Sequence, residues 1–90
     1  MKCYAVKLTH FSYTLGNGLH RVIGMWTGVI RDYRGLLGEK PDMQNNCTYA
    51  LFDKEINAKH ACNKLKTMWE QVEYIGAMEV NKSDIRKVGR

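Results

Sequence analysis

The chain has 90 residues, 44% of them hydrophobic and 26% charged, with a formal net charge of +5. This length suits one small domain, the composition is that of a globular chain, and no apolar run approaches the roughly 18 residues that suggest a membrane span. The opening residues, MKCYAVKLTH, alternate polar and apolar and lack the apolar centre of a signal peptide. We therefore expect a cytoplasmic protein with one domain over residues 1–82 and a basic C-terminal tail over 83–90.

The three cysteines, Cys3, Cys47 and Cys62, are odd in number and far apart in the sequence. Without an export signal, they are predicted to be reduced and mostly buried thiols. No spacing typical of metal ligands and no glycine-rich phosphate loop occurs, so we expect neither a metal nor a cofactor.

Residues 2–11 predict a first strand, because Tyr4, Val6 and Leu8 recur at the two-residue period of a sheet face. The dipeptide Asn17-Gly18 follows and is a strong signal for a tight hairpin turn. The next segment, 20–33, has apolar residues at helical spacing but is rich in Val, Ile, Thr and aromatic residues, and Gly24 and Gly28 disfavour a helix. We predict a second strand there; the alternative is a βαβαβ order with residues 19–37 helical.

Residues 35–46 hold the single proline, two glycines and two adjacent asparagines, which predicts a loop. A third strand is expected at 47–53, the main helix at 53–76 and a fourth strand at 77–82, with Met78 and Val80 towards the core. The predicted fold is α+β: an antiparallel sheet of about four strands, ordered hairpin, strand, helix, strand, with one amphipathic helix packed on it.

The predicted helix has an apolar stripe at intervals of three and four residues, typical of a face packed on a sheet. Its members are Ala58, Ala61, Cys62, Leu65, Met68, Trp69 and Val72. Asp53 is expected to cap the N-terminus and Gly76 to follow the C-terminus.

The lysines of this helix do not form a single basic face. Lys59 and Lys66 fall on one flank of the stripe, where Glu55 and Glu70 are i,i+4 partners of opposite sign. Lys64 falls on the other flank, beside His60, with no acidic residue near it. The helix is thus predicted to be first a core element and at most one edge of a binding surface.

The basic excess lies outside the helix. Residues 20–34 have three arginines against one aspartate, and residues 82–90 have four basic residues against one acidic residue. Guanidinium groups bind phosphate in a bidentate manner, and Tyr33 between Arg31 and Arg34 could stack on an unpaired base. The predicted nucleic-acid-binding residues are Arg21, Arg31, Tyr33, Arg34, Lys59, Lys64, Lys66, Arg86 and Lys87.

Enzyme signals are few. A small metal-independent ribonuclease would need a cluster of acid–base groups, and His20-Arg21 is the one candidate, with no partner fixed nearby by spacing. We therefore expect a non-catalytic RNA-binding module. One alternative is a protein-only inhibitor that acts through apolar contacts such as Leu36, Leu37 and Met43; the other is the ribonuclease.

The strand–helix–strand segment TYALFDKEINAKHACNKLKTMWEQVEYIGAMEV, in a short basic chain, resembles the small accessory proteins of T-even-type bacteriophages. The RNA-binding inhibitors of the host toxin ToxN are proteins of this kind and are similar in size and charge. This resemblance implies an anti-defence protein that acts in the host cytoplasm and binds RNA together with a host protein. It assigns no individual site residue. Because the core of so short a chain is modest, a homodimer or a bound partner would add stability.

Overall fold

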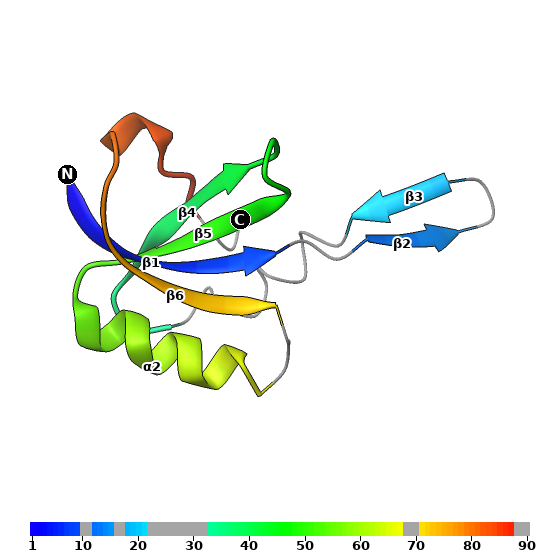
Figure 1. Ribbon diagram of the computed structural model, residues 1–90. Helices are drawn as coiled ribbons and strands as arrows, with labels where there is room; N and C mark the ends of the chain where they lie inside the picture. Colours follow the sequence, from blue (N-terminus) through cyan, green and yellow to red (C-terminus); the bar gives the residue numbers. More distant parts are fainter. Residues whose placement is uncertain (10–11, 16–17, 22–32, 68–70, 88–90) are drawn as a thin grey trace.

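A computed structural model describes residues 1–9, 12–15, 18–21, 33–67 and 71–87, with only the backbone described for 12–15 and 18–21. The described chain contains a four-stranded antiparallel sheet with one α-helix packed on one face (Figure 1). The predicted α+β fold is confirmed. None of the described helices has the length and apolar character needed to cross a membrane.

The strand order of the sheet is β4-β5-β1-β6, and every neighbouring pair is antiparallel. A separate hairpin, β2–β3, extends beyond the end of β1 (Figure 1). The elements are β1 (Lys2–Thr9), β2 (Ser12–Leu15), β3 (Gly18–Arg21), β4 (Leu36–Asp42), β5 (Cys47–Phe52), α2 (Glu55–Leu65), β6 (Val72–Glu79) and the 3₁₀ helix η1 (Lys82–Asp84).

The predicted hairpin is present, but it lies outside the main sheet. Leu15 pairs with Gly18, so Gly18 belongs to β3 rather than to the turn. The first strand was predicted over 2–11 and ends at Thr9. The second was predicted over 20–33; its start lies in β3, residues 33–35 are a turn, and 22–32 lie outside the described residues. The helical alternative is wrong at both ends, because 19–21 and 36–37 are strand.

The predicted loop at 35–46 is wrong over Leu36–Asp42, which form the edge strand β4, and is confirmed at 43–46, which are a turn. Pro41 is tolerated there because an edge strand has an outer side that needs no N–H donor. Gly38 lies at an irregularity of the register, with φ of 152°. Leu36 and Leu37 are half-buried against the core, so of the three apolar residues proposed for protein contact only Met43 is exposed.

The main helix was predicted over 53–76 and is shorter, since α2 ends at Leu65 and β6 begins at Val72. The sequence 72–78 alternates buried or half-buried with exposed residues, which is the period of a strand. Gly76, predicted to follow the helix, lies within β6 at a bulge with φ of 103°. Asp53 does not cap the helix, because the N-cap is Lys54 and has no side-chain cap hydrogen bond.

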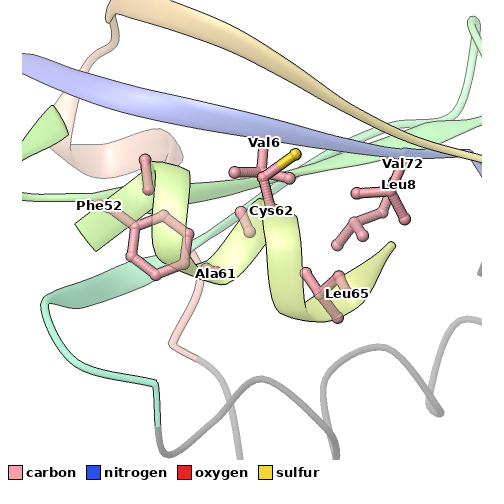
Figure 2. Close-up of a cluster of buried hydrophobic side chains, with 9 residues drawn as sticks. Val6, Leu8, Phe52, Ala61, Cys62, Leu65 and Val72 are labelled. Atoms are coloured by element: carbon pink, nitrogen blue, oxygen red, sulfur yellow. The ribbon is translucent and has the colours of Figure 1, made fainter. Parts of the chain in front are cut away.

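The core on the helix side of the sheet contains residues from four elements. Figure 2 shows Val6 and Leu8 of β1 and Phe52 of β5 facing the helix. Ala58, Ala61, Cys62 and Leu65 form the buried face of α2, as the stripe predicted. Val72 is also buried in this core, but from β6, and Met68 and Trp69 lie outside the described residues.

A second core fills the other face of the sheet. Cys3, Ala5, Leu51 and Val80 are buried there, with Met78 and Ile85 packed against them, so the inward orientation predicted for Val80 and Met78 is confirmed. Ile85 follows η1, and the next residue, Arg86, pairs with Glu39 of β4 through two backbone hydrogen bonds of 2.7 and 2.8 Å. Residues 80–86 of the C-terminal segment therefore cover this face rather than extending freely from it.

All three cysteines are free and buried, as predicted. Burial raises the pKa of Cys3 and of Cys62, which lowers the thiolate fraction at neutral pH. We expect Ellman's reagent at pH 8 to react at least about tenfold more slowly with the native protein than with the guanidinium-unfolded chain, which should release three equivalents. Stoichiometric reaction of the native protein within the mixing time would contradict this burial.

Candidate nucleic-acid interface

A hollow of about 380 Å³ lies between α2 and the turn that precedes β4. The helix lines the hollow with the flank opposite the one that contacts Tyr74 of β6, and the turn lines it with Tyr33 and Arg34. The described residues that line it are Tyr33, Arg34, Ile56, Asn57, His60, Ala61 and Lys64.

The turn Tyr33–Gly35 is closed by one backbone hydrogen bond and held near the start of α2 by another. The N–H of Leu36 donates to the Tyr33 carbonyl at 3.3 Å and closes the turn. The N–H of Asp53, two residues before α2, donates to the Gly35 carbonyl at 3.0 Å. The side-chain amide of Asn57 in turn donates to Asp53 Oδ1 at 3.0 Å. Arg34 is therefore positioned beside the helix by pairing that continues the β4–β5 ladder.

Gly35 is the residue that permits this approach. It has φ of 77°, and a Cβ at this position would overlap Asp53 Oδ1 and lie 2.5 Å from Asn57 Nδ2. We expect Gly35→Ala to lower the free energy of unfolding by about 1–2 kcal/mol, a fall of roughly 5–15 °C in Tm, because the positive φ strains a residue with a side chain, while the Asp53 and Asn57 side chains can move aside. Thermal unfolding followed by circular dichroism measures this, with exposed Ser83→Ala as control; equal Tm values for the two variants would contradict it.

Tyr33 is half-buried and packs against the helix-side core, so it is less exposed than a free stacking platform. Burial raises the pKa of its phenol, and the buried hydroxyl oxygen has no hydrogen-bond partner among the described residues. The Lys64 ammonium lies 5.4 Å from the centre of its ring. This cation–π contact holds Lys64 at the hollow.

The charge of the hollow is positive. Arg34, His60 and Lys64 are exposed, and no carboxylate is found among the described residues that line it. His60 and Lys64 are one helical turn apart and share a face of α2. Asn57 adds a polar group whose nitrogen is engaged by Asp53, which leaves its amide oxygen as an acceptor.

Two of the lysines predicted to bind nucleic acid lie on the opposite flank of α2. Lys59 forms an ion pair with Glu55 at 3.7 Å, as predicted, and its ammonium lies 5.7 Å from the Tyr74 ring. The Tyr74 hydroxyl donates to Glu55 at 3.2 Å, which ties the helix to β6. Lys66 is exposed at the C-cap, and its predicted partner Glu70 lies outside the described residues.

The C-terminal basic residues Arg86 and Lys87 are not among the residues that line the hollow. Arg86 Nη2 lies 3.1 Å from Oε2 of Glu39, a carboxylate that is 1% exposed. The positive charge of Arg86 therefore compensates the buried carboxylate of Glu39. The next residue, Lys87, is exposed. Arg21 lies in β3, where only the backbone is described, and Arg31 lies outside the described residues.

The structure thus brings together Tyr33, Arg34 and Lys64 of the predicted set, with His60 that the sequence placed beside Lys64. Ile56 and Asn57 were missed. Helical spacing places Asn57 on the Lys64 flank and Ile56 one turn before His60, and that was the available signal, but neither residue type alone suggests a ligand. In the described part of the chain, no group of three or more His, Cys, Asp or Glu residues is arranged to hold a metal ion.

Fold and site together define a small α+β domain with a cationic, partly aromatic hollow at the edge of its helix. Comparison with protein-family models, with curated proteins and with solved structures gives no significant match.

Proposed function

We propose that this protein is a non-catalytic RNA-binding module and that the hollow beside α2 anchors the RNA. The observation that carries the proposal is the convergence of Arg34, Lys64 and His60 on one hollow, with Lys64 over the Tyr33 ring and no carboxylate among the described lining residues. An arginine and a lysine supply the phosphate contacts that dominate nucleic-acid affinity.

Single-stranded RNA fits this surface better than a duplex. The hollow is local, whereas proteins that bind duplex RNA contact the phosphates of successive grooves over many base pairs. Asn57 and His60 also offer hydrogen-bonding groups that can reach a ribose 2′-hydroxyl or the edge of a splayed base. Exposed apolar surface at Ile56 adds a contact that a base or ribose can cover.

The proposal predicts binding that weakens with salt. For a short fluorescent single-stranded RNA, each neutralised phosphate contributes a slope of about −0.7 to the plot of log K against log salt concentration. Two or three contacts should therefore give a slope between roughly −1.4 and −2.1 in a fluorescence anisotropy titration. A flat response, or no binding at low salt, would overturn the function proposed.

Inhibition of a host protein by the RNA-bound form is a second part of the proposal, supported by the resemblance to phage accessory proteins. Met43 and Ile75 are large apolar side chains, 51% and 40% exposed, that do not line the hollow and are free to contact a protein. Affinity purification from host cells with and without nuclease tests this part. A partner lost on nuclease treatment supports a complex through RNA, and a partner retained at high salt favours the protein-only alternative.

A further inference from the structure

The residues that line the hollow are of two chemical kinds. Arg34, Lys64 and His60 supply groups that donate hydrogen bonds to an anion. Ile56 supplies apolar surface and is 59% exposed. A ligand that contacts both kinds of residue needs an anionic end joined to a flat or apolar body, which is the chemistry of a nucleotide.

The volume limits how much of an RNA chain can enter. About 380 Å³ lies near the lower end of the roughly 300–1,000 Å³ range of small-molecule sites. One nucleotide occupies a space of this order, so the hollow is sized for about one nucleotide. The rest of the RNA must therefore lie outside the hollow.

The charge of the hollow favours a phosphate at a chain end. An internal phosphodiester has one negative charge, whereas a phosphomonoester has about −1.5 to −2 at neutral pH and three free oxygens. Arg34 and Lys64 are two full cations, and among the described lining residues no acid offsets them. A guanidinium can bind two phosphate oxygens while an ammonium binds the third.

We propose that the hollow is a subsite for the terminal nucleotide of an RNA that carries a phosphomonoester. Arg34 and Lys64 bind the phosphate, His60 donates to it, and the base lies against Ile56. The Asn57 amide oxygen accepts a hydrogen bond from the ribose or the base, because its nitrogen is held by Asp53. This inference rests on the proposed RNA binding and adds which part of the RNA the site recognises.

The test compares three RNAs of one sequence, with a 5′-phosphate, a 3′-phosphate or hydroxyls at both ends. Fluorescence anisotropy, with an internal label, should give at least about tenfold tighter binding for one phosphorylated RNA than for the unphosphorylated one, since the added charged hydrogen bonds are strong. The RNA that binds more tightly shows whether the hollow holds the 5′ end or the 3′ end of the chain. Nucleoside monophosphate should also compete better than nucleoside or inorganic phosphate.

Variants separate this inference from the function on which it rests. Lys64→Ala should remove the preference for the phosphorylated end, whereas Lys59→Ala, the same change on the opposite flank of α2, should retain it. Equal binding of all three RNAs by the wild-type protein, with the salt dependence intact, would overturn the terminal subsite and leave RNA binding standing. Failure of all three RNAs to bind would overturn both.

Discussion

Replacing Phe52 by alanine is expected to lower the free energy of unfolding by about 3–5 kcal/mol, the cost of removing a fully buried aromatic side chain. Phe52 has no exposed surface and belongs to the helix-side core, where its ring lies beside α2 (Figure 2). A domain of this size has a total stability of roughly 5–13 kcal/mol, so this loss removes roughly a quarter of it or more. Urea denaturation followed by circular dichroism at 222 nm measures the change.

The matched control is Met43→Ala, which truncates a large apolar side chain that is 51% exposed. A surface change of this kind should alter stability by no more than about 0.5 kcal/mol. If the urea midpoints of the two variants agreed, Phe52 could not have the buried position described.

The double variant Arg34→Ala/Lys64→Ala is expected to weaken binding of single-stranded RNA by about 100-fold or more at low salt. Each substitution removes a charged hydrogen bond worth about 1.5–3 kcal/mol, and both act in the same hollow. Fluorescence anisotropy measures the loss. The urea midpoint of the variant should stay near that of the wild type, because both side chains are exposed.

Lys59→Ala/Lys66→Ala is the control for this experiment, because it removes the same two charges from the opposite flank of α2. It lowers the net charge equally, so it reproduces the loss of long-range attraction without touching the hollow and should cost only a few-fold in affinity. Equal losses in the two double variants would show that RNA responds to the total charge of the chain rather than to the hollow.

Local patterns in the sequence were sufficient to predict the elements whose hydrophobic spacing fits only a strand or only a helix. Val6 and Leu8 alternate with polar residues, and Ala58, Ala61, Cys62 and Leu65 recur at helical intervals, so β1 and the buried face of α2 were predictable. The end of the helix was not, because Val72 fits the helical stripe as well as the alternation of a strand. Its burial in β6 satisfies both patterns.

Strand β4 was missed for a different reason. Gly38 and Pro41 are usual signals for a loop, and an edge position that makes both acceptable depends on the neighbouring strands rather than on β4 itself. The packing of residues 80–86 over the second sheet face could not be predicted either. It depends on the pairing of Arg86 with Glu39, which are 47 residues apart in the sequence.

The candidate site was predictable only on its helical side. Helical geometry placed Lys64 and His60 together and separated them from Lys59 and Lys66, as the structure has them. The meeting of Tyr33 and Arg34 with this flank depends on the β4–β5 register, in which Leu36 pairs with Phe52 and brings Gly35 beside Asp53. No spacing along the chain encodes that register, so the sequence assigned the arginines to a hairpin and a tail instead.

RNA binding at the hollow is tested most directly by a map of backbone amide shifts in ¹H–¹⁵N NMR spectra during titration with single-stranded RNA. We expect the largest changes on the residues around the hollow, which are Arg34, Ile56, Asn57, His60, Ala61 and Lys64. Changes on β6, around Tyr74, or on η1 should be small. Shifts concentrated on β6 or η1, with the hollow unaffected, would contradict the claim that the hollow beside α2 is the RNA-binding site.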